Sequence, residues 1–579
     1  MDLNNALTRW TELLGSERVC GGDAVRDRYA RSTHPGGTRP AAVVFPANRE
    51  EVQEVVRIAH ANRVPLYPIS RGNNWGYGDA CAVSDGQVIV DLRRMNRIME
   101  VDSELAYAVI EPGVTQQQLY EFLRDRDLPL WLDVTGAGPD ASIVGNTLER
   151  GFGHSPAGDH YHASAGYEVV LADGSLLATG FGHYENAQAA HLFKPGIGPS
   201  LDGLFTQSNF GIVTRMGVWL NRRPEYLEAF GLKAEREEDI VDIVNALREL
   251  RLAGTVQSTV HIANDLRALS ARSRYPWDAM HGKSPLTSAM REELRKTHGM
   301  GAWNVLGGIY GTRATVHGAR TEIRKALRHL GRVHFFDENM LRRAENLTRF
   351  AGRHGLFSRT CELVTLIRPA FDLLKGIPRR EHLFGAGWRA KDAPADPTLD
   401  PLNNRWGFMW LSPILPMSGG HARNFIARVE PIYAAFGFET LLTMTTITAR
   451  ALCSVLTVAY DKEDLEEGQR ALQCYDALWE TCMDAGYVPY RCGIRSMNKL
   501  DAGSQHYWDA VRNLKVALDP HGIIAPGRYL PRSNSPILES NEQRMERTFD
   551  AYCHHALPVA PAKDRPVRPA KSNLELCST

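Results

Sequence analysis

The sequence predicts a protein of mixed helices and strands that folds into at least two domains. Its 579 residues exceed what one hydrophobic core usually serves. Short strand-like and helix-like segments alternate through the first 220 residues, and longer amphipathic helices mixed with strand-like runs follow from about Pro224. Short, turn-rich segments return near residue 485. A first domain that is completed by the later part of the chain would explain this return.

Strand-like runs rich in valine and isoleucine occupy much of the first 113 residues. These runs are AAVVFP (41–46), VPLYPIS (64–70), QVIVDL (87–92) and YAVIEPG (107–113). Between the first two runs, apolar residues recur at the spacing of one helix face. They are Val52, Val55, Val56 and Ala59. The pattern therefore predicts the order strand, helix, strand for residues 41–70.

Local signals mark further elements. Thr115 followed by Gln118 is a capping-box pattern, which predicts a helix that begins with QQQLYEFLRD (116–125). The segment AGYEVVLADGSLLATG (165–180) predicts a hairpin that turns at Asp173-Gly174. In the second domain, amphipathic helices are predicted at EEDIVDIVNALREL (237–250) and ARTEIRKALRHL (319–330), and a strand at ALCSVLTVAY (451–460).

These changes in the length and type of the predicted elements divide the chain into four segments. The N-terminal part of the first domain spans residues 1–224, the second domain spans 225–485, and residues 486–531 complete the first domain. Residues 532–579 are rich in proline, serine and charge, as in PVAPAKDRPVRPAKSN (558–573). Such a composition cannot bury enough apolar surface to fold, so we expect a flexible tail.

The composition argues against several functional classes. Acidic and basic residues balance at 67 each, so no net field would recruit nucleic acid or an anionic membrane. The nine cysteines are scattered without a CxxC pair, which argues against a disulfide framework or a zinc site. No apolar run is long enough for a membrane span, and the N-terminal residues lack the apolar core of a secretory signal. We expect a cytoplasmic protein that acts on small molecules.

The stretch PISRGNNWGYGDAC (68–81) follows a predicted strand and contains Gly72, Gly76 and Gly78. Glycine lacks a Cβ atom, so such a turn can bring backbone N–H groups close to a phosphate. The alternative is a plain connecting turn. Two further turn-rich stretches between β-rich runs, at 136–160 and 201–220, favour a nucleotide site.

Seven motifs occur in one order between about residues 40 and 530. They are PISRGNNWGYG, IVGNTLERGFGHSPAGDH, YEVVLADG, GLFTQSNFGIVT, LSPILPMSG, PYRCGIRSMNKL and LDPHGIIAPGRY. With these motifs the sequence resembles the vanillyl-alcohol oxidase/4-cresol dehydrogenase (hydroxylating) family of FAD-linked oxidoreductases. The resemblance implies an α+β, two-domain fold: a discontinuous FAD-binding domain (1–224 and 486–531) and a central cap or substrate domain (225–485) with an antiparallel sheet flanked by helices.

The resemblance also implies which residues bind FAD. The 68–78 loop would hold the pyrophosphate through Ser70, Gly72, Asn73 and Asn74. The later segments would line the cofactor with Ile143, Gly145, Asn146, Gly151, Gly211 and Ile212. Arg528 is implied to lie near the pyrimidine edge of the flavin, with a solvated arginine as the alternative.

Three residues are implied to act on the substrate: Tyr77, Tyr490 and Arg491. Two hydroxyl groups and one guanidinium that converge on a phenol oxygen favour its ionised form. The family chemistry would then remove hydride from the benzylic carbon of a 4-substituted phenol and leave a quinone methide. For Tyr490 and Arg491, the end of an ordinary amphipathic strand is the alternative.

Two departures from the family pattern stand out. Members of the family attach FAD through a histidine or tyrosine on a cap strand, where this sequence has Cys453 or Ser454. We therefore expect noncovalent FAD, with a bond to Cys453 as the alternative. The family oxidases also place an aspartate beside the flavin, where the loop DVTGAGPDAS has Thr135 or Gly136. The base that activates water is thus open, although Asp133 and Asp140 lie nearby in sequence.

Other assignments stay open at this stage. We expect a small aromatic substrate, O2 or a cytochrome as the electron acceptor, and a homodimer. His154 and His160 lie inside a family motif, so we expect them to make structural hydrogen bonds and expect no metal site. One alternative is a tailoring oxidase or dehydrogenase of a secondary pathway, acting on a non-phenolic alcohol, amine or ring-forming substrate. Another is a non-catalytic flavin-binding partner protein.

Overall fold

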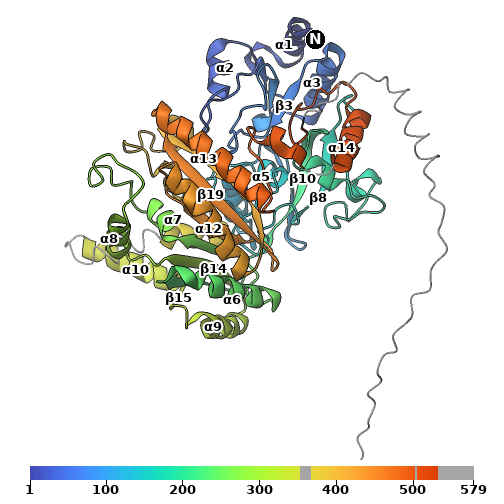
Figure 1. Ribbon diagram of the computed structural model, residues 1–579. Coiled ribbons are helices and arrows are strands. Elements are labelled where there is room, and N and C mark those ends of the chain that lie inside the picture. The colour runs from blue at the N-terminus through green and yellow to red at the C-terminus, as the bar shows by residue number, and fades with distance from the viewer. Residues whose placement is uncertain (353–366, 503–504, 532–579) are drawn as a thin grey trace, which may run out of the picture. The chain divides into compact units, whose positions relative to one another are not determined.

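The strand, helix, strand order predicted for residues 41–70 is confirmed by β2 (Ala42–Val44), α3 (Arg49–Asn62) and β3 (Leu66–Ile69). The computed structural model describes residues 1–352, 367–502 and 505–531, and the predicted tail at 532–579 lies outside the described residues. Three larger sheets organise the described chain (Figure 1).

The first sheet is four-stranded, in the order β1-β2-β4-β3. β2 and β3 both run parallel to β4 (Val88–Asp91), which lies between them, and β1 (Val19–Cys20) is antiparallel to β2. All four residues of β4 are buried, as is typical of a central strand between parallel neighbours. α1 (Leu3–Leu14) packs on α3, and the indole of Trp10 donates to the carbonyl of Val55 at 3.1 Å.

The second sheet is five-stranded, in the order β5-β6-β10-β8-β9. Its strands are β5 (Ile98–Asp102), β6 (Tyr107–Ile110), β8 (Ser164–Val170), β9 (Leu176–Ala178) and β10 (Ile212–Trp219). The predicted hairpin is confirmed, because β8 and β9 pair across the turn at Asp173-Gly174, where Gly174 has φ +80°. A short ladder also joins β7 (Leu130–Trp131) to β11 (Asn221–Arg222).

The capping box predicted for α4 (Gln116–Asp125) forms only by half. The Thr115 hydroxyl accepts from the backbone N–H of Gln118 at 3.0 Å, as predicted. The Gln118 amide does not return to Thr115 but donates to the carbonyl of Asn96 at 2.7 Å. The prediction was wrong in this half, because the carbonyl of Asn96, in the connection that leads into β5, lies within reach of the side chain.

The third sheet belongs to residues 226–461 and has the order β15-β12-β14-β13-β18-β19-β16, with β17 also paired to β19. Every pairing in it is antiparallel. Its strands are β12 (Tyr226–Ala234), β13 (His261–Asn264), β14 (Trp303–Gly311), β15 (Arg332–Asp337), β16 (Trp406–Leu411), β17 (Ile414–Pro416), β18 (Leu441–Thr446) and β19 (Ala451–Asp461).

Long helices pack on this sheet in one apolar cluster. They are α6 (Ile240–Leu252), α9 (Arg313–Leu327), α12 (Gly419–Ala435) and α13 (Leu465–Asp484). The remaining helices include α2 (Asp23–Tyr29), α5 (Ile143–Leu148), α7 (Asp265–Ser270), α8 (Ser288–His298), α10 (Glu338–Gly352) and α14 (Gln505–Leu518).

The two faces of this sheet differ in character at β18. Leu442 and Met444 belong to the apolar cluster with the helices, whereas Thr443 and Thr445 line a cavity. Successive side chains of a strand point to opposite faces, so the alternation in the sequence LLTMTT separates core from cavity. This strand therefore presents hydroxyl groups to the site described below.

Residues near the end of the described chain complete the first sheet. Leu66 of β3 donates to the carbonyl of Ile523 and accepts from the N–H of Ala525, both at 2.7 Å. The Lys515 ammonium donates to Asp519 at 2.6 Å and to the carbonyl of Ile524 at 2.8 Å. Segments from opposite ends of the sequence thus share one sheet edge and one apolar core.

Candidate active site

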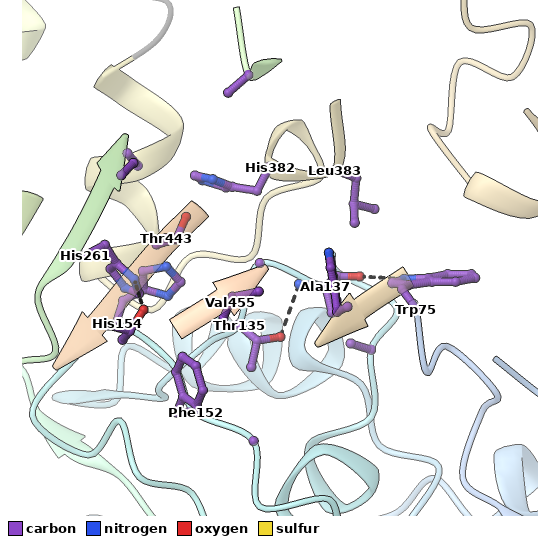
Figure 2. A pocket seen from close by; sticks show the side chains of 18 of the residues that line it. Trp75, Thr135, Ala137, Phe152, His154, His261, His382, Leu383, Thr443 and Val455 are labelled. Atoms are coloured by element: carbon purple, nitrogen blue, oxygen red, sulfur yellow. Dashed lines mark hydrogen bonds between the residues drawn. The ribbon is translucent and has the colours of Figure 1, made fainter. Parts of the chain in front are cut away.

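A cavity of about 940 Å3 lies between the loops that follow β3 and the hydroxyl-bearing face of the eight-stranded sheet. Figure 2 shows part of its wall, with Thr135, Phe152 and His154 from the N-terminal segments and His261, Thr443 and Val455 from the sheet. Many of the predicted site residues line this cavity. They are Ser70, Gly72, Asn73, Asn74, Tyr77, Gly145, Asn146, Gly151, Tyr490, Arg491 and Arg528.

The 68–78 loop bends at glycines that have little room for a side chain. Gly72 has φ +77°, and a Cβ atom on it would lie 2.8 Å from the Cβ of Ala80. Gly76 has φ +70°, and a Cβ atom there would lie 2.9 Å from the Trp410 ring. The carbonyl of Gly76 accepts from the N–H of Trp410 at 3.0 Å, which fastens the loop to β16. The loop therefore needs glycine for its fold as well as for access to a ligand.

Tyr77, Tyr490 and Arg491 line the same cavity, and two of them are in contact. The Arg491 guanidinium carbon lies 4.2 Å from the centre of the Tyr77 ring. Burial raises the pKa of Tyr77 to about 12 although Arg491 lowers it, and burial also raises the pKa of Tyr490 well above its usual value. Both phenols are therefore neutral near pH 7, where they can donate hydrogen bonds to an oxyanion.

Ser412 and Glu149, which were not predicted from the sequence as site residues, contact this cluster through a hydrogen bond and ion pairs. The Ser412 hydroxyl lies 2.6 Å from the Tyr77 hydroxyl. Glu149 lies 3.4 Å from the Arg491 Nε and also forms an ion pair with Arg528. Burial acts to raise the pKa of Glu149, but Arg528 and Arg491 together hold it below the usual value. Two guanidinium groups and one carboxylate leave a net positive charge.

The Arg528 side chain is mostly buried, so the alternative of a solvated arginine is wrong. Its side chain is only 14% exposed, and Nη1 donates to the Tyr67 hydroxyl at 2.9 Å. Three other predicted cofactor residues, Ile143, Gly211 and Ile212, do not line the cavity. Ile143 and Ile212 are buried in apolar clusters, and Gly211 packs against Val169 and Val170. They can support the cavity wall but do not form its surface.

Neither candidate linker position is part of the cavity surface, although Cys453 is the register partner of the cavity-lining Thr445 and so lies on the same face of the sheet. Cys453 is fully buried opposite Thr445 in the β18–β19 ladder, and burial raises the pKa of its thiol. Ser454 is fully buried next to it, and its register partner Met444 belongs to the apolar cluster. A neutral, buried thiol is a poor nucleophile.

The 133–140 loop, where the resemblance led us to look for an aspartate beside the flavin, presents no carboxylate to the cavity. Thr135 and Gly136 line the cavity, whereas Asp133 pairs with His160 at 2.6 Å and Asp140 with Arg380 at 2.6 Å. His160 thus has the structural role expected from the sequence. His154 bonds the carbonyl of Val134 at 2.9 Å but also faces the cavity.

Three histidines form a cluster on the cavity wall. The His154 ring centre lies 4.6 Å from that of His261 and 6.3 Å from that of His382. Burial lowers the pKa of all three, that of His382 to about 3. The imidazoles are therefore neutral at physiological pH. The sequence signal for this cluster was weak, because its members come from three distant segments.

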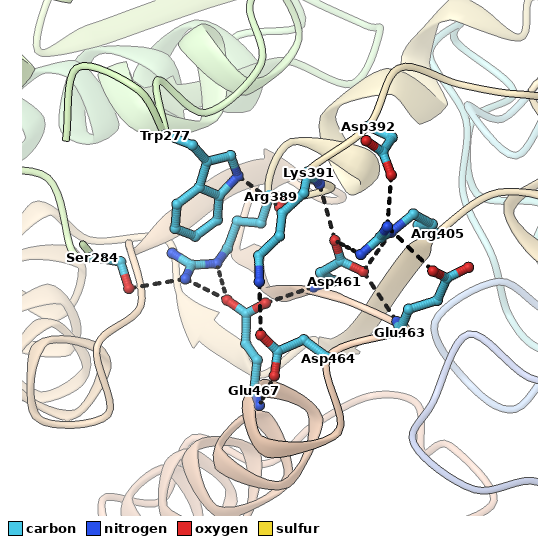
Figure 3. A network of polar contacts seen from close by, with 10 residues as sticks. All are labelled: Trp277, Ser284, Arg389, Lys391, Asp392, Arg405, Asp461, Glu463, Asp464 and Glu467. Atoms are coloured by element: carbon cyan, nitrogen blue, oxygen red, sulfur yellow. Dashed lines mark hydrogen bonds and ion pairs between the residues drawn. The ribbon is translucent and has the colours of Figure 1, made fainter. Parts of the chain in front are cut away.

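A buried ion network holds the segment that carries His382 (Figure 3). Arg389, whose side chain is 2% exposed, forms ion pairs with Glu439 at 2.6 Å and with Glu467. The rings of Tyr275 and Trp277 lie 5.1 Å from its guanidinium carbon. Through Arg389 the network links residues 381–390 to α13 at Glu467 and to the segment before β18 at Glu439, and so positions this part of the cavity wall.

Comparisons with known proteins show which protein family has this fold. Residues 40–180 match the family model described as "FAD binding domain". The 4-cresol dehydrogenase [hydroxylating] flavoprotein subunit of Pseudomonas putida is 32% identical over 91% of this chain and 95% of that protein. The chain belongs to the vanillyl-alcohol oxidase/4-cresol dehydrogenase family. It is an FAD-dependent oxidoreductase with the α+β fold of that family.

Two further proteins are similar along nearly the whole chain. The 1'-carboxy-chondrochloren decarboxylase of Chondromyces crocatus is 39% identical over 91% of this chain and 97% of that protein. The crystal structure of p-cresol methylhydroxylase with substrate bound superposes with a TM-score of 0.81 at 31% identity, over 92% of this chain and 98% of that one. Because these relatives are enzymes, the alternative of a non-catalytic flavin-binding partner is not supported.

The cavity wall fits FAD. Beside the 68–78 loop, a Cβ atom on Gly145 would lie 3.1 Å from the Ser70 hydroxyl, so glycine at this position lets the start of α5 approach the loop closely. Backbone N–H groups in such a loop suit the pyrophosphate. Within the described ranges, no group of three or more His, Cys, Asp or Glu side chains could hold a metal ion. In the same part of the chain, every helix is too short or too polar to cross a membrane.

Substitution of Gly76 by alanine is expected to weaken FAD binding about tenfold or more. The new Cβ atom would meet the Trp410 ring at 2.9 Å with φ at +70°, and such strain costs about 1–3 kcal/mol. Titration of apoprotein with FAD measures the change. Gly86→Ala is the matched control, because Gly86 has φ +81° but nothing within 4 Å of its Cβ position. Equal FAD affinity of the G76A variant and the wild type would contradict the prediction.

Proposed function

We propose that this protein removes hydride from the benzylic carbon of a 4-substituted phenol and produces a quinone methide. The observation that carries the proposal is the position of Tyr77, Tyr490 and Arg491 on one cavity wall. A phenol oxygen that enters this corner meets two neutral hydroxyl donors and a permanent cation. These groups favour the phenolate, whose electrons can then expel hydride from the 4-substituent.

The charge of the corner supports this role. Glu149 pairs with both Arg491 and Arg528, so one positive charge stays uncompensated until an anion binds. In a site screened from bulk water this charge acts more strongly than at the surface. The Tyr77 hydroxyl, held at 2.6 Å from Ser412, needs only a small change of hydrogen bonds to donate to a ligand.

FAD supplies the hydride acceptor when it is bound. Ser70, Gly72, Asn73 and Asn74 would hold its pyrophosphate, and Asn146 and Gly151 would line it farther along the cavity. We propose noncovalent attachment, because the Cys453 thiol is fully buried and its pKa is raised by burial. O2 or a cytochrome as the electron acceptor, a homodimer and a cytoplasmic location stay predictions.

A second fate of the quinone methide is favoured by one observation. No carboxylate of the 133–140 loop reaches the cavity to activate water. If the substrate has a carboxylate on the carbon next to the benzylic carbon, the bond to that carboxylate can break instead. Its electron pair forms the new C=C bond, the ring regains its aromatic phenolate, and CO2 leaves. The relative named as a decarboxylase is consistent with this fate.

The test is anaerobic reduction of the enzyme-bound flavin, followed by its absorbance. We expect 4-ethylphenol to bleach the flavin and 4-ethylanisole, its methyl ether, to leave it oxidised, because the ether cannot form a phenolate. Equal bleaching by both compounds, or by neither, would overturn the proposed function. With 3-(4-hydroxyphenyl)propanoate, release of 4-vinylphenol and CO2 indicates decarboxylation, whereas an acid hydroxylated at the benzylic carbon indicates attack by water.

A further inference from the structure

Arg267 is a cavity-lining cation for which the described chain provides no ion pair. It lies on α7, and its Nη1 donates to the Ser270 hydroxyl at 3.1 Å. The guanidinium packs closely on Gly385, where a Cβ atom would lie 2.2 Å from Nη1. Burial lowers the pKa of Arg267, but an arginine stays charged at any physiological pH. The fold therefore holds a partly desolvated positive charge at this position.

Three other basic residues of the cavity have an acidic partner. Arg491 and Arg528 pair with Glu149, and Lys233 pairs with Glu235 at 3.0 Å. Arg71 belongs to the loop proposed to hold the FAD pyrophosphate. Taken together, the described lining contains six basic side chains, Arg71, Lys233, Arg267, Arg272, Arg491 and Arg528, against the two acidic side chains Asp79 and Glu149. The cavity as a whole thus favours anionic ligands.

The neighbours of Arg267 can take part in binding an anion. Its charge is one of the influences that, after burial, keep His261 and His382 neutral. The Nε2 atoms of both imidazoles are buried and have no hydrogen bond in the described chain. A partly desolvated cation and unpaired buried ring nitrogens cost free energy unless a ligand satisfies them. A carboxylate has the charge and the acceptor oxygens to do so.

The surroundings of Arg267 are connected by a short path to the phenol corner, the part of the wall formed by Tyr77, Tyr490 and Arg491. The Phe152 ring centre lies 5.8 Å from that of Tyr490. Two residues farther along the same segment, His154 contacts His261 and His382. A ligand whose phenol oxygen lies at Tyr77 and Arg491 can therefore direct the substituent on its ring toward Arg267.

We propose that Arg267 binds a carboxylate on the 4-substituent of the substrate, so that the substrate class is 4-hydroxyphenyl carboxylic acids. The inference rests on the proposed function, because the phenol corner orients the ring. It adds a second fixed point at the other end of the ligand. A planar guanidinium suits a carboxylate because it can donate two parallel hydrogen bonds.

Two matched ligands test the inference without turnover. The acid 4-hydroxyphenoxyacetate and the uncharged 4-ethoxyphenol both have an ether oxygen at the benzylic position, so neither can lose a benzylic hydride. Their dissociation constants are measured on the FAD-loaded protein by perturbation of the flavin spectrum and by calorimetry. We expect the wild type to bind the acid at least tenfold more tightly.

The Arg267→Met variant is expected to bind the acid about 30-fold or more weakly, because truncation of one partner of a buried charge pair costs that much. The same variant should bind 4-ethoxyphenol as the wild type does. Unchanged 4-ethoxyphenol binding also shows that the variant is folded. Arg267→Lys keeps the charge and should recover part of the preference. Arg57→Met, which removes an exposed arginine that does not line the cavity, should change neither constant.

Two results would overturn the inference while leaving the proposed function intact. One is equal affinity of the wild type for the two ligands. The other is an equal loss of affinity for both ligands in Arg267→Met. If neither ligand binds and 4-ethylphenol fails to bleach the flavin, the proposed function itself is wrong, and the inference falls with it.

Discussion

Replacement of Arg491 by methionine is expected to slow anaerobic flavin reduction by 4-ethylphenol about 100- to 1000-fold, the effect of losing one oxyanion-stabilising donor. The guanidinium contacts the Tyr77 ring and pairs with Glu149. Without it, Glu149 and Arg528 cancel each other, and the corner has no net positive charge to stabilise a phenolate. Stopped-flow absorbance of the flavin measures the rate.

Arg491→Lys is the matched control for charge. It keeps a cation near Glu149 but loses the planar group over the Tyr77 ring, so its rate should lie between those of the wild type and the methionine variant. Thermal melting of each variant separates a loss of fold from a loss of chemistry. A methionine variant that is folded and reduces its flavin at the wild-type rate would contradict the role given to Arg491.

Replacement of Arg389 by methionine is expected to lower the free energy of unfolding by about 3–5 kcal/mol. Glu439 and Glu467, both buried, would lose the cation that lies between them. Methionine fills much of the arginine volume among Tyr275 and Trp277, so the loss reports mainly on the two carboxylates. The midpoint of urea unfolding measures it.

Two further variants make this result specific. The triple variant Arg389→Met, Glu439→Gln, Glu467→Gln removes the charges together and should recover most of the lost stability, because no buried charge is left unpaired. Arg57→Met removes an exposed arginine whose pair with Glu54 is solvated, and should cost less than about 1 kcal/mol. Equal losses in Arg389→Met and the triple variant would show that the cost comes from packing.

The loops of the site could be predicted from the sequence better than the side chains that complete it. The order of the motifs identified the family and, by resemblance, residues such as Tyr77 and Arg491 that line the cavity. Glu149 lies inside one quoted motif, yet nothing in the sequence showed that it would face two arginines. Ser412 and Arg267 come from segments far from Tyr77 and the histidines, and a single sequence does not show which distant segments meet.

Predictions from local sequence patterns were also wrong where a group from a distant segment offered the side chain another hydrogen-bond partner. The Gln118 side chain of the predicted capping box bonds the carbonyl of Asn96, which propensity rules do not include. His154 and His160 lie six residues apart in one motif, but Asp133 draws His160 into a buried pair while His154 faces the cavity. Periodicity was more reliable: the apolar spacing of Val52, Val55, Val56 and Ala59 predicted a helix, and all four are buried on α3.

The hydrogen bonds between Leu66 and residues 523–525 have a consequence for biosynthesis. When the first seventy residues leave the ribosome, strand β3, which leads into the 68–78 loop, has no partner on its outer edge. Its partner is translated only after the entire second domain. The nascent protein must therefore hold an incomplete sheet open during most of elongation, an interval in which chaperones would protect that edge from aggregation.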